Sequence, residues 1–262
     1  MKISISYPPL ESKKGIALLS QNRQFQWFNN PTYIYPVIPA FAATLLKEKG
    51  YEVFWDDAIA EELTYAQWEE RIIKENPDII AFETKTPVVE MHWKIIDKLK
   101  EKMPSTKIVL MGDHVTAKPQ ESMEKSKVDF VISSGDYDFM LLSLANHLSK
   151  GESLEGGFWF RRDGEVANSG PSDLSKHDLN TLPMIDRELT KWQNYAYKNG
   201  NFKYTPGTYM MSGRDCWWGR CTFCSWTTFF PGKNFRTRSA KNALDEVGHL
   251  IDLGVKEIME DS

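Results

Sequence analysis

Long apolar runs are absent from this sequence of 262 residues. No stretch reaches the roughly 18 consecutive apolar residues that a membrane-spanning helix needs, and residues 1–15 hold no apolar core of a secretion signal. A large excess of one charge is absent too, because 32 Lys and Arg stand against 36 Asp and Glu. We therefore expect a cytoplasmic protein with no membrane span and no nucleic-acid partner.

Cysteine is scarce, with three residues that all fall within positions 216–224. An odd number of cysteines this close together excludes the paired disulfide framework of small secreted domains. The rest of the composition, with 41% hydrophobic and 26% charged residues, is typical of a globular protein with a large core. Clustered thiols in such a protein indicate a metal site or redox chemistry.

Strand and helix patterns alternate through the first 150 residues. The expected strands cover residues 2–7, 51–57, 78–84, 107–113 and 128–134, and the expected helices cover 38–49, 64–75, 89–103, 119–126 and 137–151. This alternation predicts an α/β fold with a doubly wound, Rossmann-like parallel sheet over residues 1–150. Ligands of such sheets bind at the carboxyl ends of the strands, here in the loops SYPPLES, FETKTP, GDHVTAKP and SSGDYD.

The remaining residues divide into two further segments. Residues 151–206 predict a connector with a hairpin that turns at Asp163 and Gly164. Residues 207–262 predict a strand at 208–214, a helix at 239–254 and a strand at 255–261, with the cysteines after the first strand. Because a complete barrel of such units needs about 200 residues, we expect only the first, truncated part of a TIM-type barrel, which further chain or a partner completes.

The cysteines Cys216, Cys221 and Cys224 have the spacing C-x4-C-x2-C. Three thiolates can bind three irons of a four-iron four-sulfur cluster and leave the fourth iron open to a substrate or cofactor. The same loop offers positive charge and backbone N–H groups that suit an anionic cluster, from Arg214, Gly219 and Arg220.

Other uses of three thiols stay open at this point. A zinc site needs a fourth ligand, for which His177 and His249 are the candidates. An electron-transfer cluster needs a fourth cysteine, which the sequence lacks. Thiols with a purely structural role are the third alternative, although burial alone gives no reason for a C-x2-C pair.

The stretch SGRDCWWGRCTFCS resembles the cluster loop of the radical S-adenosylmethionine (SAM) enzymes. The resemblance implies that the three cysteines bind the cluster and that SAM binds the open iron. It also implies that Phe223 lies near the adenine and that Glu260 or Asp261 binds the SAM amino group, with surface acids at a strand end as the alternative. The first gap between cysteines is one residue longer than the family's usual C-x3-C-x2-C, which leaves the conformation of the loop open.

Five earlier segments resemble, in order, the cobalamin-binding domain that precedes the radical SAM barrel in one large class of these enzymes. They are YPPL, IPAFAATLLKEKGYEVFWDD, NPDIIAFETKTP, KIVLMGDHVTAKPQE and VDFVISSGDYD, and the connector LNTLPMIDRE follows them. The cobalamin contacts that the resemblance implies are Tyr7, Pro8, Thr84, Lys85, Thr86, Pro87, Gly112, Asp113, His114, Val115, Thr116, Ser134, Gly135 and Asp136. The chain lacks the D-x-H-x-x-G sequence with which many such domains offer a histidine to cobalt.

Some of these residues have an alternative role. The loop of Lys85 faces the lower side of the corrin in the relatives, where a cation disfavours an axial ligand; the alternative is a lysine in solvent. His114 either contacts the corrin edge or is a turn histidine bonded to the backbone. Four indoles either line a cavity between the domains or have an ordinary packing role; they are Trp27, Trp217, Trp218 and Trp226.

The resemblance implies an enzyme with three cofactors, a four-iron four-sulfur cluster, SAM and cobalamin. The implied reaction is reductive cleavage of SAM to a 5′-deoxyadenosyl radical, most often for methyl transfer to an unactivated carbon. The implied partners are a small-molecule or peptide substrate and a one-electron donor such as flavodoxin or ferredoxin. The alternatives are a radical rearrangement or cyclisation, a cobalamin-binding or interaction module without catalysis, and a structural zinc-bound domain. No catalytic residue is assigned.

Overall fold

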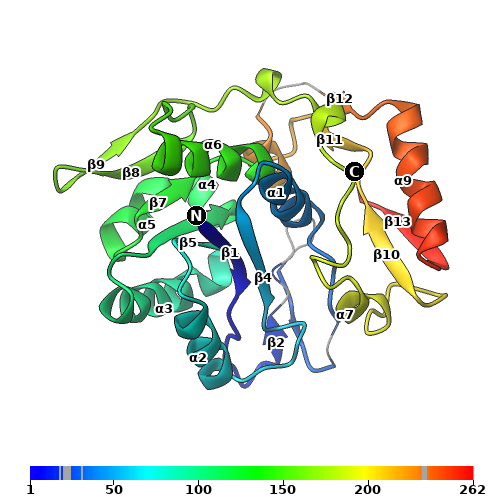
Figure 1. Ribbon diagram of the computed structural model, residues 1–262, viewed down its shortest axis with the longest axis horizontal. Helices are drawn as coiled ribbons and strands as arrows, with labels where there is room; N and C mark the ends of the chain where they lie inside the picture. Colours follow the sequence, from blue (N-terminus) through cyan, green and yellow to red (C-terminus); the bar gives the residue numbers. More distant parts are fainter. Residues whose placement is uncertain (18, 20–24, 31, 232–234, 262) are drawn as a thin grey trace.

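A seven-stranded sheet forms the centre of the molecule (Figure 1). The computed structural model describes residues 1–17, 19, 25–30, 32–231 and 235–261. Five strands run parallel, in the spatial order β4 (Glu52–Asp57), β1 (Lys2–Tyr7), β5 (Ile79–Thr84), β6 (Lys107–Gly112) and β7 (Phe130–Ile132). The predicted doubly wound α/β fold is confirmed, with the switch in strand order between β1 and β5.

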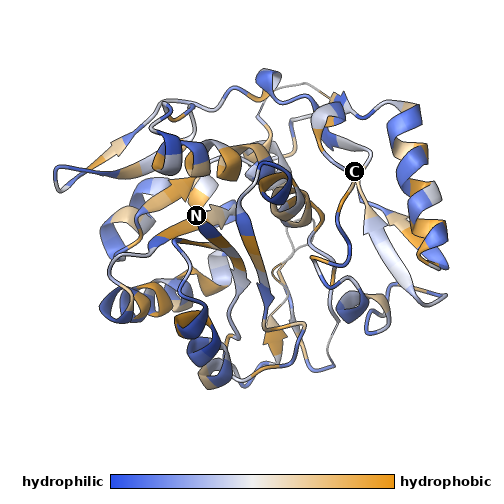
Figure 2. Ribbon diagram, in the orientation of Figure 1, coloured by the Kyte–Doolittle hydropathy of each residue, from blue (hydrophilic) through white to orange (hydrophobic). Residues whose placement is uncertain are grey.

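Helices cover both faces of the parallel strands. On one face α1 (Val37–Glu48) packs against α6 (Tyr137–Lys150), and on the other lie α2 (Tyr65–Glu75), α3 (Val89–Lys102) and α5 (Pro119–Lys125) (Figure 1). The strands between them are largely apolar, as the orange segments in Figure 2 show. Burial on both faces explains why β5 and β6 read as nearly continuous apolar runs.

Several helix ends follow signals that the sequence contains. The Thr64 hydroxyl accepts a hydrogen bond from the Gln67 N–H, and the Gln67 side chain accepts one from the Thr64 N–H, which forms a capping box for α2. The loop predicted after β6 is wrong, because α4 (Asp113–Ala117) begins directly at the strand end. Gly112, with φ +129°, turns the chain there, and its carbonyl accepts from the Thr116 hydroxyl at 2.7 Å.

The predicted hairpin is confirmed, and it extends the sheet. The first of its strands, β8 (Phe158–Arg162), pairs antiparallel with β7, and β9 (Glu165–Asn168) pairs with β8. The turn residues Asp163 and Gly164 have φ values of +52° and +86°, as a two-residue hairpin turn of the I′ type requires. The sheet therefore continues beyond residue 150, and the domain boundaries stay a prediction.

The C-terminal part holds one strand–helix–strand unit beside the sheet (Figure 1). Its strands β10 (Gly207–Met210) and β13 (Glu257–Glu260) pair in parallel, and α9 (Ala240–Asp252) leads into β13. The single strand predicted for residues 208–214 is wrong, because the chain leaves the ladder after Met210. Its continuation, β11 (Gly213–Asp215), pairs antiparallel with β12 (Phe235–Thr237) instead.

Arg187 fixes the connector to this unit. Its guanidinium, 2% exposed, donates to the Thr208 hydroxyl at 2.8 Å, to the Tyr209 carbonyl at 3.0 Å and to the Glu246 carboxylate of α9 at 2.9 Å. A buried charge is stable only when it is paired and hydrogen-bonded in this way. The connector therefore sets the position of the strand that leads to the cysteine loop.

The other helices and strands of the described residues are short. They are β2 (Ile16–Ala17), β3 (Trp27–Phe28), α7 (Gln193–Ala196), α8 (Trp226–Phe229) and 3₁₀ turns at Thr86–Val88, Leu174–Lys176 and Leu179–Thr181. Within the ranges that the structure describes, no helix has the length and apolar character needed to cross a membrane.

Candidate functional site

The carboxyl ends of the parallel strands meet at one edge of the sheet, and the residues expected to contact cobalamin gather there. Tyr7 ends β1, Thr84 ends β5, Gly112 ends β6, and residues 134–136 follow β7. The edge includes the switch point between β1 and β5, where folds of this kind bind their ligands.

Most of this edge is covered by the chain itself. The buried members of the expected set are Tyr7, Pro8, Thr84, Lys85, Gly112, His114, Val115, Ser134, Gly135 and Asp136. Asp113 and Thr116 are half-buried, and Thr86 and Pro87 are exposed. The structure therefore brings the expected contacts together and leaves the loop after β5 as their most accessible part.

Lys85 lies inside the protein, with 1% of its surface exposed. Its Nζ is 3.8 Å from the Asp113 carboxylate and 5.9 Å from the centre of the Phe229 ring. The alternative of a lysine in solvent is therefore wrong. An ammonium group is buried only where negative charge or aromatic faces compensate its lost hydration.

Glu83 is a buried carboxyl group that the sequence analysis missed. Its Oε2 accepts a hydrogen bond from the Tyr7 hydroxyl at 2.7 Å, and its Oε1 has no hydrogen-bond partner among the described residues. Burial raises the pKa of Glu83 to about 7, although the Lys85 charge opposes the shift. The only signal for this group in the sequence is an acid within the apolar run DIIAFET.

Tyr137 is a second buried polar group without a partner at this edge. It begins α6, it has no exposed surface, and its hydroxyl has no hydrogen-bond partner among the described residues. Burial raises the pKa of Tyr137 well above its ordinary value, and the charges of Glu83 and Asp113 add to the shift. Orphaned polar groups are rare in native structures, so two at one edge indicate more than packing.

His114 lies in α4 between two side chains. Its Nε2 is 3.1 Å from Oε2 of Glu121 and its Nδ1 is 3.4 Å from the Thr86 hydroxyl. The ring packs edge-on against Trp93, with centroids 6.1 Å apart. Because both nitrogens face side chains, the alternative of a turn histidine bonded to the backbone is wrong.

A buried ionic cluster joins the loop after β7 to the cysteine loop. Arg214 is 1% exposed and donates to Asp136 at 2.9 Å and to Asp138 at 3.0 Å, and both carboxylates have no exposed surface. Arg214 stands two residues before Cys216, at a sequence distance of 76 from Asp138. Its guanidinium is therefore engaged by Asp136 and Asp138. The sequence analysis expected its charge to offset an iron–sulfur cluster instead.

Two more side chains complete this ionic cluster. Arg236 donates to Asp136 at 2.6 Å and to Asp215 at 2.7 Å. His177 places Nδ1 2.7 Å from Asp136 and Nε2 3.0 Å from Glu155. Burial alone lowers the pKa of His177, but its hydrogen bonds to the two carboxylates outweigh burial and raise the pKa to about 9.

The Asp136 carboxylate is fully occupied by this cluster. Burial raises its pKa, but the hydrogen bond to His177, the charge of Arg214 and the hydrogen bond to Arg236 outweigh burial and hold the pKa well below its usual range. Its N–H donates to the Ser134 hydroxyl and its carbonyl accepts from the Met140 N–H, so a contact between Asp136 and cobalamin stays a prediction. Both ring nitrogens of His177 face carboxylates of this cluster, so neither is free to be the fourth ligand of a zinc site at the cysteines.

The three cysteines follow β11 on a loop of half-buried and exposed residues. Cys216, Cys221 and Cys224 are all half-buried free thiols, and the Gly219 N–H points to the Cys216 sulfur at 3.5 Å. Over the described part of the chain, no group of three or more His, Cys, Asp or Glu side chains is arranged to hold a metal ion. The donor types therefore fit an iron–sulfur cluster, and the three sulfurs are not gathered for one.

The residues expected near SAM lie around the same loop. Phe223 is 87% exposed between the last two cysteines. Glu260 ends β13, and its Oε1 accepts from the Ser212 N–H at 2.8 Å and from the Ser212 hydroxyl at 3.0 Å. Asp261 is buried, and its N–H donates to the Met210 carbonyl at 3.0 Å. Both acids thus hold β13 to the chain that enters the loop, and their contact with SAM stays a prediction.

The segment Trp226–Phe230 carries the chain from the last cysteine onto the carboxyl edge. Phe229 and Phe230 are each 1% exposed, and the Phe229 carbonyl accepts from the Gly135 N–H at 3.1 Å. A Cβ added to Gly135 would lie 2.4 Å from the Phe230 ring, so only glycine permits this contact. Sequence patterns gave no signal for it, since the two segments are far apart along the chain.

The four indoles do not line one cavity. Trp217 and Trp218 are 71% and 48% exposed. Trp226 packs on Phe230 with ring centroids 4.7 Å apart, and Trp27 packs edge-on against Phe25 at 5.3 Å. Ordinary packing is therefore the role of the two inner indoles.

The fit of cobalamin to this edge is mixed. The residue types suit a polar ligand, because Glu83 and Tyr137 each have a buried polar atom without a hydrogen-bond partner among the described residues. The arrangement does not suit it, because the Phe229 and Phe230 rings cover Lys85 and Gly135. In this arrangement the two rings occupy the space next to Lys85 and Gly135.

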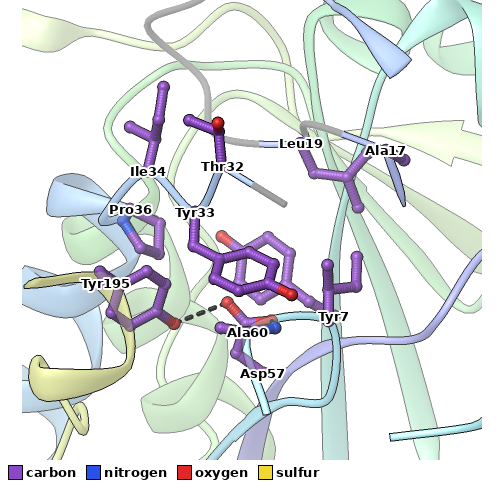
Figure 3. A pocket seen from close by; sticks show the side chains of 11 residues that line it. Tyr7, Ala17, Leu19, Thr32, Tyr33, Ile34, Pro36, Asp57, Ala60 and Tyr195 are labelled. Carbon is purple, nitrogen blue, oxygen red and sulfur yellow. Dashed lines mark hydrogen bonds between the residues drawn. The ribbon is translucent and has the colours of Figure 1, made fainter. Parts of the chain in front are cut away.

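A separate small pocket opens on the β1–β4 side of the same edge (Figure 3). Tyr7, Tyr33, Asp57 and Tyr195 line it, and its volume of about 30 Å³ holds a water molecule and no cofactor. Tyr195 donates to Asp57 at 2.6 Å, and burial raises the pKa of Asp57 to about 6. The pocket thus adds a second buried acid to the sheet edge without adding a cofactor site.

The chain is similar to a domain family and to several known proteins. Residues 32–142 match the family model of the B12 binding domain. An uncharacterized methyltransferase of Pyrococcus horikoshii is 26% identical over 226 residues, which cover 85% of this chain and 47% of the relative. The anaerobic magnesium-protoporphyrin IX monomethyl ester cyclase of Rubrivivax gelatinosus is 27% identical over 224 residues, which cover 82% of this chain and 39% of the relative.

The fold has a solved counterpart. The cobalamin-dependent S-adenosylmethionine radical enzyme OxsB, with aqua-cobalamin bound, superimposes with a TM-score of 0.74 at 16% identity. The match covers 99% of this chain and 34% of OxsB. The chain thus spans about half the length of the curated relatives it matches, or less. Residues 32–142 thus match the B12 binding domain, and most of the chain is similar to a methyltransferase, to a cyclase and, in fold, to a cobalamin-dependent radical SAM enzyme.

Proposed function

We propose that this protein acts as a cobalamin-dependent radical SAM enzyme. When bound, the cluster and SAM supply a 5′-deoxyadenosyl radical by reductive cleavage of SAM, and cobalamin supplies a methyl group for an unactivated carbon. The observation that carries the proposal is the ion pairing of Arg214 with Asp136 and Asp138, which joins the start of the cysteine loop to the chain that follows β7. Two cofactors that act on one substrate must be held at a fixed distance and orientation from each other.

The chain's own residues have separate tasks in this proposal. Cys216, Cys221 and Cys224 bind three irons and leave the fourth to SAM. Phe223 is exposed beside the last thiol, where an adenine can stack on its ring. Glu260 is at the end of β13, where its carboxylate can accept from the amino group of SAM.

The proposal includes two partners. A one-electron donor such as flavodoxin or ferredoxin reduces the cluster, and the exposed position of the cysteine loop supports such an encounter. The substrate is a small molecule or a peptide. Methyl transfer is the preferred outcome because a relative is named a methyltransferase, and cyclisation is second because another relative is named a cyclase.

The test is electron paramagnetic resonance of the full chain after anaerobic reconstitution with iron and sulfide and reduction with dithionite. We expect a reduced four-iron signal that changes when SAM is added, and 5′-deoxyadenosine in the mixture. Cys224→Ser removes the signal, whereas Thr222→Ala, an exposed neighbour in the same loop, keeps it. A signal that SAM does not alter contradicts an open iron, and zinc without labile sulfide supports the structural zinc domain instead.

A further inference from the structure

We propose that residues Trp226–Phe230 form a lid, which must leave the carboxyl edge of the sheet before cobalamin binds there. The inference rests on the proposed function, since it takes cobalamin as the ligand of this edge. It follows from a disagreement within the structure: the residue types of the edge suit the cofactor, and the aromatic rings of this segment cover them. The segment is called the aromatic lid below.

The aromatic lid lies on the residues expected to contact cobalamin. The Phe230 ring occupies the space beside Gly135, and the Phe229 ring lies 5.9 Å from the Lys85 ammonium. Phe229 also packs edge-on against Tyr137, with ring centroids 6.2 Å apart. A corrin ring and these two side chains therefore compete for the same face.

The aromatic lid is a single layer with one buried side and one exposed side. One backbone hydrogen bond, from the Gly135 N–H to the Phe229 carbonyl, joins it to the loop after β7. Ser225, Thr228 and Pro231 are exposed, so the outer side of the segment faces solvent while its inner side is buried. Opening exposes the Phe229 and Phe230 rings, which pack into the core, and leaves the strands of the sheet paired.

The closed lid leaves polar groups unsatisfied beneath apolar rings. Oε1 of Glu83 and the hydroxyl of Tyr137 have no hydrogen-bond partner among the described residues. Cobalamin carries amide groups around its ring, which can donate to a carboxylate and accept from a hydroxyl. Exchange of the rings for such a ligand therefore removes a cost that the closed state carries.

Movement of the aromatic lid also moves the cysteine loop. The Thr227 hydroxyl donates to the Cys224 carbonyl at 2.8 Å, and the Trp226 indole donates to the Asp215 carbonyl at 2.8 Å. The closed state thus has a covered cobalamin face and thiols that are not gathered. Because coupling between two sites is reciprocal, cobalamin binding and cluster assembly influence each other through this segment.

The first experiment measures the Kd of hydroxocobalamin for the full chain by equilibrium dialysis. Phe229→Ala and Phe230→Ala weaken the closed state, so the Kd falls by about tenfold or more if the lid is closed most of the time. Phe160→Ala, in the hairpin that pairs with β7, is the matched aromatic control and leaves the Kd unchanged. Equal affinities in all four proteins overturn the lid and keep the proposed function, whereas no binding in any of them rejects cobalamin as a ligand.

A second experiment needs no substitution and so does not depend on the folding of the variants. Hydrogen exchange is followed in the wild-type chain with and without hydroxocobalamin. The amide of Gly135 and the amides of the aromatic lid lose protection when the cofactor binds, while those of Val109 and Leu110 in β6 keep it. Unchanged protection at Gly135 in the cobalamin-bound chain means that the lid stays closed, and it overturns the inference.

Discussion

Replacement of Arg214 by methionine removes the cation at the centre of the buried ionic cluster. Asp136 and Asp138 have no exposed surface, and Arg214 donates to both of them. Arg236 and His177 still compensate Asp136, but Asp138 loses its charged partner. Loss of one partner from a buried ion pair costs about 3–5 kcal/mol, because the remaining charge is left without compensation. We therefore expect Arg214→Met to lower the free energy of unfolding by about that amount.

The assay is urea denaturation followed by circular dichroism, with three comparison proteins. Arg220→Met removes an exposed arginine of the same loop and is expected to change the free energy of unfolding by less than about 0.5 kcal/mol. Arg214→Lys keeps the charge and loses the two-pronged geometry, so its loss is intermediate. Asp138→Asn in the Arg214→Met background recovers part of the loss, since it removes the unpaired charge. A loss below about 1 kcal/mol in Arg214→Met refutes the reasoning.

Three further predictions concern single residues. The pKa of His177 is raised to about 9 in the folded state, so protonated His177 stabilises the fold fully below pH 6.5, and this stability is lost as the pH rises to about 9. We expect His177→Gln to flatten this part of a curve of unfolding free energy against pH. An unchanged slope contradicts the assignment. Burial raises the pKa of Glu83 from 4.5 to about 7, so the free energy of unfolding falls as the pH rises through that range. We expect Glu83→Gln to remove this fall and to be the more stable protein at pH 8 in denaturation experiments. The opposite order of stability shows that the buried carboxylate is stabilised. Gly112 has a φ of +129°, and Gly112→Ala places a Cβ 2.0 Å from the Thr84 carbonyl oxygen, so we expect a strongly lowered melting temperature. The control Gly248→Ala lies in α9, where its Cβ meets nothing within 4 Å, and it is neutral or stabilising by up to about 1 kcal/mol. Equal melting temperatures for the two glycine variants contradict the close approach of β5 and β6.

Local patterns in the sequence predicted most of the fold. Apolar runs and helical spacing located the five parallel strands and their helices, because each element buries one face or two faces against its neighbours. The hairpin turn at Asp163 and Gly164 was also predicted, since it is set by residues only a few positions apart. The helix α4 was missed because Gly112 and Asp113 are typical of a loop and also permit a helix to begin.

The candidate site was predicted in part. The cysteines stand in one short motif, and the strand ends were placed by topology, so both could be found from the sequence. Arg214 and Asp138 are 76 positions apart, and no local pattern shows that they pair. The same holds for the Phe230 ring on Gly135, which depends on how the C-terminal unit packs against the sheet. A place below the corrin and a place in solvent were both open for Lys85, and its burial follows from the chain that covers the edge.

The measurement that tests the central claim most directly is the cofactor content of one chain. The purified protein is reconstituted anaerobically with iron, sulfide and hydroxocobalamin, desalted, and analysed for iron, cobalt, zinc and labile sulfide. The account predicts about four irons and about one cobalt per chain, with the iron lost in a variant that replaces Cys216, Cys221 and Cys224 by alanine. Zinc without labile sulfide or cobalt would contradict it.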